Sequence, residues 1–305
     1  MRVLVTGASG FVGRWMVDEL RSAGHEVTAT PPRDRLDIND EAAVAALVDT
    51  ARPEGVIHLA GMAYGPDANL DPDGAERVNV HGTATLLQSV RSISPRAPVL
   101  VAGSAEVYGT PNPSDLPLAE SAPTRPRNAY GRSKLAQEET ALAGARAGHL
   151  AIAVTRSFNH TGPGQRPEFV APALARRLLA AQEAGQVEIA VGNIDVRRDI
   201  GDVRDVARAY RLILEGLSAG QIGWGSVLNV ATGRSVLIRD MLETLAELIG
   251  VAVRPRIDPS LVRADDPPDF VGDASRLKAL TGWEPRFPLR QTLSDLVDSL
   301  RSVPA

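Results

Sequence analysis

Two side chains capable of proton chemistry, Tyr130 and Lys134, are four positions apart in the sequence. On a helix this spacing places a phenol and an ammonium on one face, one turn apart. We expect the ammonium to favour the phenolate, to lower the pKa of Tyr130 and so to make it a proton donor or acceptor near neutral pH. Such pairs also occur as surface decoration, so their meaning depends on the surrounding residues.

A serine and a glutamate follow an apolar run at residues 98–103. This run predicts a strand, and doubly wound folds place their chemistry at the carboxyl ends of such strands. Ser104 could hydrogen-bond the oxygen of a reacting carbonyl, and Glu106 would bring a carboxylate beside it. The four polar side chains together indicate a catalytic site.

Three glycines directly follow the first predicted strand, residues 3–5, and open a helix. Without Cβ atoms the turn can tighten and its backbone can approach a pyrophosphate, while the helix N-terminus offers N–H groups and a positive dipole. This context predicts a dinucleotide site. Its expected members are Gly7, Gly10, Phe11, Val12 and Gly13.

The tip of the second predicted strand bears on the choice of cofactor. An acid there would bind the ribose 2′-hydroxyl of NAD, whereas an arginine would accept the 2′-phosphate of NADP. The strand ends at Thr30 and is followed by two prolines and Arg33, with no acid at the tip. We therefore expect NADP, with NAD less favoured because Asp34 lies next to Arg33.

The elements that must position these residues alternate along the chain. Strands are predicted at 3–5, 26–30, 55–60, 98–103 and 151–156, and helices at 11–23, 41–51, 75–92 and 130–147. This order predicts an α/β fold with a doubly wound parallel sheet, the Rossmann arrangement, covered by helices on both faces. The proline-rich segment 110–127 predicts an ordered loop across the mouth of the sheet, or a mere connector.

The second half of the chain is less regular. Helices are predicted at 170–183, 203–217 and 238–249, and a strand at 227–230. We expect residues 1–158 to form a dinucleotide-binding domain and 159–305 to form mainly a smaller α/β substrate-binding domain. The chain is expected to return to the first domain around 199–232.

Composition limits the classes of function. The 305 residues are 44% hydrophobic and 23% charged with a net charge of -4, which is typical of a globular protein that does not bind nucleic acid. The absence of cysteine excludes disulfides and thiolate metal sites, and the histidines lack metal-ligand spacing, so no metal is expected. No apolar run approaches the roughly 20 residues of a membrane span, so we expect no membrane association and a cytoplasmic location.

Several segments together resemble the extended short-chain dehydrogenase/reductase family over essentially the whole chain. They are Gly7 to Gly13, Asp37-Ile38, His58 to Gly61, Asn79, Ser104 to Gly109 and Tyr130 to Lys134. The resemblance implies that Asp37 and Ile38 border the adenine, although Asp37 could equally be a carboxylate at a helix N-terminus. It also implies that Leu59, Ala60 and Gly61 line the ribose and nicotinamide, that Ser104, Tyr130 and Lys134 form a catalytic triad, and that Lys134 binds ribose hydroxyls.

The second half is similar to the GDP-mannose branch of this family in residues 156–165, 169–170, 192–193 and 197–205. The similarity implies a set of residues that hold the nucleoside diphosphate. They are Asn159, Phe169, Val170, Arg176, Arg198, Arg263 and Asp266. The residue types fit, because arginine forks match phosphate oxygens and an acid suits ribose hydroxyls. His160 is interpreted as a structural hydrogen-bonding histidine.

The resemblance implies an NADPH-dependent reductase of a nucleotide 4-keto-6-deoxy sugar. The expected reaction converts GDP-4-keto-6-deoxy-D-mannose to GDP-6-deoxy-D-mannose, also called GDP-D-rhamnose. The alternatives are a GDP-mannose 4,6-dehydratase, a nucleotide-sugar 4-epimerase or, in another class, a non-catalytic NADP-binding sensor or scaffold. The nucleotide base and the C4 stereochemistry of the product stay open. A homodimer is expected through the helices at 75–92 and 130–147.

Overall fold

A computed structural model describes residues 1–262 and 266–302 of the chain. The central element is a six-stranded parallel sheet of order β2-β1-β3-β4-β5-β9. Its strands are β1 (Arg2–Thr6), β2 (Glu26–Ala29), β3 (Gly55–His58), β4 (Val99–Ala102), β5 (Ile152–Ser157) and β9 (Ser226–Val230). The strand order reverses between β1 and β3, and open α/β sheets bind ligands at the carboxyl ends beside such a reversal.

Helices cover both faces of this sheet. On one face lie α1 (Phe11–Ser22) and α8 (Val203–Ser218); on the other lie α2 (Glu41–Ala51), α5 (Gly82–Ile93) and α6 (Ala129–Arg146). The pleat of β4 divides the two cores, because Leu100 packs toward α1 and α8 while its neighbours Val99 and Val101 pack toward α5 and α6. The predicted doubly wound α/β fold is confirmed.

The helix predicted at 75–92 is interrupted. Two short helices, α3 (Gly65–Leu70) and α4 (Pro72–Glu76), precede a π-helical turn, η1 (Arg77–His81), which then continues into α5. Asn79 lies inside this turn; its Oδ1 accepts from the backbone N–H of Met62 at 2.8 Å and its Nδ2 donates to Ser133 Oγ at 2.9 Å. The turn thus places the side-chain amide of Asn79 in contact with the segment after β3 and with α6. Such π-helical turns are frequent at functional sites.

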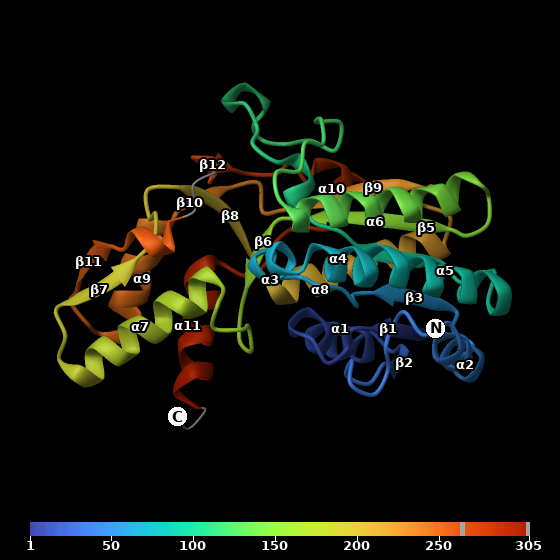
Figure 1. Cartoon of the computed structure of the whole chain (residues 1–305), viewed down its shortest axis with the longest axis horizontal. Coiled ribbons are helices and arrows are strands. Elements are labelled where there is room, and N and C mark those ends of the chain that lie inside the picture. The colour runs from blue at the N-terminus through green and yellow to red at the C-terminus, as the bar shows by residue number, and fades with distance from the viewer. Residues whose placement is uncertain (263–265, 303–305) are drawn as a thin grey trace.

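The rest of the chain builds a smaller α/β part with its own apolar core (left in Figure 1). Its helices are α7 (Val170–Ala184), α9 (Ile238–Ile249) and α11 (Leu289–Arg301). Its strands are β6 (Asn159–Thr161), β7 (Glu188–Val191), β8 (Arg197–Asp202), β10 (Ser235–Leu237), β11 (Arg254–Ile257) and β12 (Asp269–Phe270). β8 pairs with β6, β10 and β12, whereas β7 pairs with β11 alone. Of the second-half elements, β9 is a strand of the large sheet, α8 packs on that sheet, and α10 (Ser275–Thr281) packs against these two.

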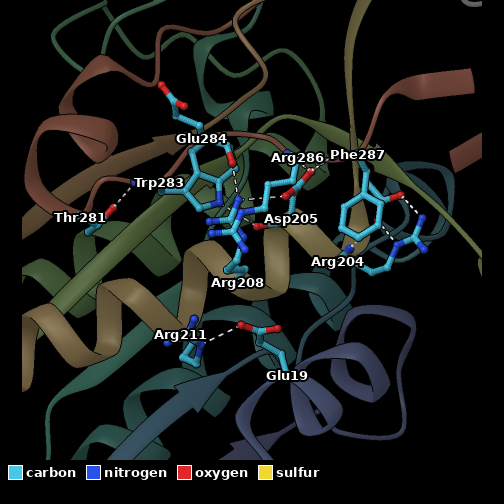
Figure 2. Close-up of polar contacts among 11 residues, drawn as sticks. Glu19, Arg204, Asp205, Arg208, Arg211, Thr281, Trp283, Glu284, Arg286 and Phe287 are labelled. Carbon is cyan, nitrogen blue, oxygen red and sulfur yellow. Dashed lines mark hydrogen bonds and ion pairs between the residues drawn. The ribbon is translucent and has the colours of Figure 1, made fainter. Parts of the chain in front are cut away.

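A buried carboxylate at the start of α8 fixes the C-terminal segment (Figure 2). Asp205 Oδ2 accepts from the backbone N–H groups of Arg286 at 2.9 Å and Phe287 at 3.0 Å, and its other oxygen is 3.0 Å from Arg208. The indole of Trp283 donates to the carbonyl of Asp205 at 3.0 Å. These contacts hold the segment before α11 against α8, and so tie the smaller part to the large sheet.

The proline-rich segment 110–127 runs out from the body and back (green, top of Figure 1). It contains a short 3-10 turn, η3 (Pro113–Asp115). Its base is held because Leu118 pairs with Gly272 and Arg125 donates its N–H to Val107. In the described ranges, no helix combines the length and apolar character needed to cross a membrane.

Candidate active site

The glycine-rich turn leaves room for backbone alone. Gly7 has a φ of +69°, and a Cβ built on it would lie 2.7 Å from the backbone nitrogen of Ala60. A Cβ on Gly13 would lie 2.2 Å from the carbonyl oxygen of Gly7, so the helix can approach the strand only without a side chain here. Gly10 is the N-cap of α1, whose first turn, with Phe11 and Val12, contains no acid. These features fit the pyrophosphate of a dinucleotide at a helix N-terminus.

The segment after β2 places Arg33 and Asp37 together on the surface. Asp37 Oδ1 accepts from the backbone N–H of Asn39 at 3.0 Å and from its side-chain amide at 2.8 Å. These bonds, and to a smaller degree Arg33, lower the pKa of Asp37. The N-cap of α2 is Asp40, and Asp37 lies three residues before it. Ile38 is buried in the core beside it.

The segment after β3 lies directly over Lys134. Ala60 donates its N–H to Thr6 Oγ1 at 3.2 Å, which fixes Leu59 to Gly61 beside the glycine turn. A Cβ built on Gly61 would lie 2.7 Å from Asn79 Oδ1 and 3.6 Å from Lys134 Nζ. The structure therefore brings together the glycine turn, this segment and the lysine of the predicted catalytic set.

Ser104 and Tyr130 are brought together at the carboxyl end of β4. Ser104 is buried and begins η2 (Ala105–Tyr108), where its Oγ accepts from the N–H of Glu106 at 3.2 Å. Tyr130 lies in the first turn of α6, whose N-cap Asn128 accepts from Gly131 at 2.7 Å. Because Oγ of Ser104 accepts from the backbone, its hydroxyl hydrogen stays available for a second partner.

The expected lowering of the pKa of Tyr130 is wrong for this structure. Burial raises the pKa of Tyr130 well above its ordinary value; a hydrogen bond from Ser104 lowers it in part, and the charge of Glu106 raises it again. The ammonium of Lys134 is engaged elsewhere, with the carbonyl of Ala102 at 3.0 Å and with Gln137 Oε1 at 2.8 Å. Tyr130 is thus protonated at neutral pH, the form from which a phenol can donate a proton.

The residues predicted for the nucleoside diphosphate fall into two groups. Phe169 is the N-cap of α7 and Val170 its first residue; with Asn159 on β6 and Arg176 on α7, they lie wholly or partly exposed to solvent. Phe169 packs edge-on against the ring of Tyr64, with centroids 5.1 Å apart. These exposed groups are open to a ligand.

Arg198 is buried and already paired. Its Nη1 donates to the carbonyl oxygens of Arg197 at 2.6 Å and Pro267 at 2.8 Å, and its Nη2 is 2.8 Å from Asp266 Oδ1. The structure brings together the predicted Arg198 and Asp266 as an ion pair. Arg263 lies outside the described residues.

Sequence reasoning missed Arg166, which bridges the two sides of the site. Its guanidinium lies 5.3 Å from the ring centre of Tyr64 and 3.3 Å from carboxylate oxygens of Asp67 and Glu168. Tyr64 and Asp67 follow β3, whereas Arg166 precedes α7. No motif marks these residues, because the pairing spans about a hundred positions.

The segment before Arg166 also rests on the first helix of the cofactor turn. The ring of Phe11 stacks on His160 with centroids 6.1 Å apart and 8° between the planes, and Trp15 donates to the carbonyl of Pro163 at 3.1 Å. Nδ1 of His160 is 3.0 Å from the carbonyl of Phe158, a structural hydrogen bond. The cofactor turn and the predicted substrate segment are therefore in direct contact.

The fold and this constellation define a class of protein. A match to the NAD dependent epimerase/dehydratase family covers residues 3–231, and the chain belongs to this family. It is an NAD(P)-dependent oxidoreductase of the extended short-chain dehydrogenase/reductase type.

Individual relatives narrow the comparison. The chain is 35% identical over 302 residues to the GDP-6-deoxy-D-mannose reductase of Pseudomonas aeruginosa, covering 99% of this chain and 97% of the relative. The structure of RMD from Pseudomonas aeruginosa complexed with NADPH matches with a TM-score of 0.90 and 33% identity, covering 99% of both chains. The Thermus thermophilus UDP-glucose 4-epimerase complex with NAD matches with a TM-score of 0.86 and 28% identity, covering 100% of both.

Proposed function

We propose that the chain reduces the C4 keto group of GDP-4-keto-6-deoxy-D-mannose with NADPH to give GDP-6-deoxy-D-mannose. The observation that carries the proposal is the convergence of Ser104, Tyr130 and Lys134 beside the glycine turn. The similarity to a GDP-6-deoxy-D-mannose reductase over 99% of the chain supports the sugar and the base. The same resemblance supports a homodimer formed through α5 and α6.

Each side chain has a definite task in this reaction. Bound NADPH would supply the hydride, with its pyrophosphate at the turn of Gly7 to Gly13. Ser104 hydrogen-bonds the carbonyl oxygen and Tyr130 gives that oxygen its proton, because the phenol is protonated at neutral pH. Lys134 contributes positive charge beneath Gly61 and donors for ribose hydroxyls.

The position of Glu106 makes a dehydratase the second candidate function. It is close enough to Tyr130 to raise the pKa of the phenol, which is where a deprotonating base would be useful. Two features favour the reductase. Only residues 31–37 separate Thr30 from Ile38, so no insertion clamps the adenosine end, and the turn at Gly162 to Gln165 resembles reductase sequences. An exchangeable cofactor suits a reductase, which consumes NADPH in every turnover.

Two parallel assays test the reaction. Purified protein with GDP-4-keto-6-deoxymannose and NADPH is expected to oxidise NADPH in proportion to sugar reduced, followed by nicotinamide absorbance. The same protein with GDP-mannose and catalytic NADP is expected to give no keto sugar by mass spectrometry. The reverse pattern would establish a dehydratase. No reaction in either assay would reject these GDP sugars as substrates, and another nucleotide sugar would then be tested.

The cofactor preference is tested at Arg33. We propose that its guanidinium pairs with the 2′-phosphate of NADPH, because it is exposed beside the tip of β2 and no acid stands at that tip. Arg33→Ala is expected to weaken NADPH binding by about tenfold or more and NADH binding by less than about twofold. Fluorescence titration measures both dissociation constants. Equal losses of affinity for NADPH and NADH would contradict the pairing of Arg33 with the 2′-phosphate.

A further inference from the structure

A continuous chain of buried polar side chains runs inward from Lys134. It passes from Lys134 on α6 to Gln137 on the next turn, to Thr83 on α5, to His58 on β3 and to Thr6 on β1. None of the five is more than 6% exposed. Buried polar groups are costly unless they are fully hydrogen-bonded, so the direction of each bond can be worked out.

Thr83 fixes the direction of the whole chain. Its hydroxyl donates to the carbonyl of Asn79 at 2.6 Å, so its oxygen can only accept from its other neighbours. Those neighbours are Nε2 of Gln137 and Nε2 of His58, both at 2.9 Å. His58 therefore carries its hydrogen on Nε2, and its Nδ1 accepts from Thr6 at 2.6 Å. Burial lowers the pKa of His58 to about 3, so the ring stays neutral.

The same reasoning orients the amide of Gln137. Because its Nε2 faces Thr83, its Oε1 must face Lys134, where it accepts from Nζ at 2.8 Å. A flipped amide would turn a donor toward the ammonium and an acceptor toward Thr83 Oγ1, whose hydrogen is already given to Asn79. The carbonyl of Ala102 takes a second hydrogen of Nζ at 3.0 Å. One of the three ammonium donors is then left for a ligand below Gly61.

We propose that Gln137 is a positioning residue for Lys134, and that its amide, held by Thr83 above neutral His58, fixes the ammonium beneath the cofactor segment. The proposal rests on the proposed function, because Lys134 has its task only in an NAD(P)-dependent reaction. An ammonium in a dry site tends to lose its proton, and burial lowers the pKa of Lys134 to about 8. The amide oxygen of Gln137 opposes this tendency by accepting from the charged form.

Among the described residues, the groups that accept hydrogen bonds from the ammonium of Lys134 are neutral. The titratable groups near Lys134 include His58 on β3, Tyr130 on α6 and, beyond Tyr130, Glu106 on η2. Glu138, next to Gln137, is 2.6 Å from Arg156 on β5, so its carboxylate pairs with Arg156 and not with Lys134. No carboxylate among these contacts the ammonium, which leaves Gln137 and the carbonyl of Ala102 as the acceptors that the described residues provide.

Two substitutions at Gln137 should act in opposite directions. Gln137→Leu removes the acceptor, whereas Gln137→Glu supplies a negatively charged one. We expect the leucine variant to bind NADPH about twofold more weakly at about pH 7 and about tenfold more weakly at about pH 9, because a pKa lowered by about one unit leaves fewer molecules with the charged ammonium. The midpoint at which affinity falls with rising pH should move about one unit lower, since Lys134 would lose its proton sooner. The glutamate variant should move that midpoint higher.

The measurement is a fluorescence titration of the full chain with NADPH from about pH 6 to about pH 10, repeated for NADPH oxidation where turnover is seen. Gln182→Leu is the matched control, because Gln182 donates to the carbonyl of Ile249 in the smaller part, away from Lys134. Its midpoint should equal that of the wild type. Melting temperatures separate lost stability from a shifted midpoint.

The outcomes are distinct. Opposite shifts for Gln137→Leu and Gln137→Glu, with none for Gln182→Leu, would support the positioning role. Unshifted midpoints in both Gln137 variants would overturn it, even where the reductase assay succeeds. Wild-type protein that fails to bind NADPH at any pH would overturn both this inference and the proposed function, whereas NADPH binding without turnover would reject only the proposed substrate.

Discussion

Replacing Tyr130 with phenylalanine is expected to lower reductase turnover by about 100- to 10,000-fold, the usual contribution of a general acid. Phenylalanine keeps the ring and removes only the hydroxyl that can protonate the substrate oxygen. NADPH affinity and melting temperature should stay near their wild-type values, because α6 and its N-cap are unchanged. Steady-state NADPH oxidation gives the turnover, and fluorescence titration gives the affinity.

Tyr210→Phe is the matched control for this loss. Tyr210 is buried on α8, and its hydroxyl is 2.6 Å from Ser157 Oγ, so the substitution also removes one buried hydroxyl. It should cost about 1 kcal/mol of stability and leave turnover within about twofold of wild type. A Tyr130→Phe enzyme that kept more than half of its turnover at unchanged NADPH affinity would remove Tyr130 from the proton step.

The large sheet was predictable because its signals are local. Short β-branched runs alternate with amphipathic helices, and the bounds of α2, for example, are those predicted. The π-helical turn η1 was not predictable. Asn79 breaks the helix by binding Met62 and Ser133, which lie far from it in the sequence, and no local pattern records such contacts. The three-residue strands β6 and β10 were missed since they are too short to show a period of two.

The types of the site residues were more predictable than their electrostatics. Spacing alone placed Tyr130 and Lys134 on one helix. The pKa of the phenol, however, depends on burial, and the spacing of residues along a helix does not reveal how deeply a side chain is buried. Likewise Arg198 has the residue type of a phosphate ligand, whereas its ion pair with Asp266 joins residues far apart in the chain. Composition gave no sign that Arg166 packs on Tyr64.

A buried ion pair behind the site gives the largest expected effect on stability. Arg156 on β5 binds both carboxylate oxygens of Glu138 on α6, at 2.9 and 2.6 Å, and the side chains are only 8% and 4% exposed. The same guanidinium donates to the carbonyl of Glu120 at 3.1 Å and lies 4.8 Å from the ring centre of Tyr108. It therefore joins the sheet, α6, η2 and the base of the proline-rich loop.

Arg156→Met should lower the free energy of unfolding by about 3–5 kcal/mol, because the carboxylate of Glu138 would be left buried and unpaired. That is a large fraction of the roughly 5–15 kcal/mol that keeps a domain folded. Urea denaturation measures the loss. The double variant Glu138→Leu with Arg156→Met should recover much of it, since no charge then remains in the site, although the bond to Glu120 stays lost.

Arg290→Met is the surface control. Arg290 pairs with Glu247 at 2.9 Å, but the two side chains are 61% and 66% exposed, so the loss should not exceed about 1 kcal/mol. Equal losses for Arg156→Met and Arg290→Met would show that burial of the Arg156 pair carries no special weight. A double variant less stable than Arg156→Met alone would show that the carboxylate of Glu138 finds another partner. Recovery of stability in the double variant would instead show that the loss in Arg156→Met comes from the unpaired carboxylate of Glu138. Helix α6, which carries Tyr130, would then be otherwise intact.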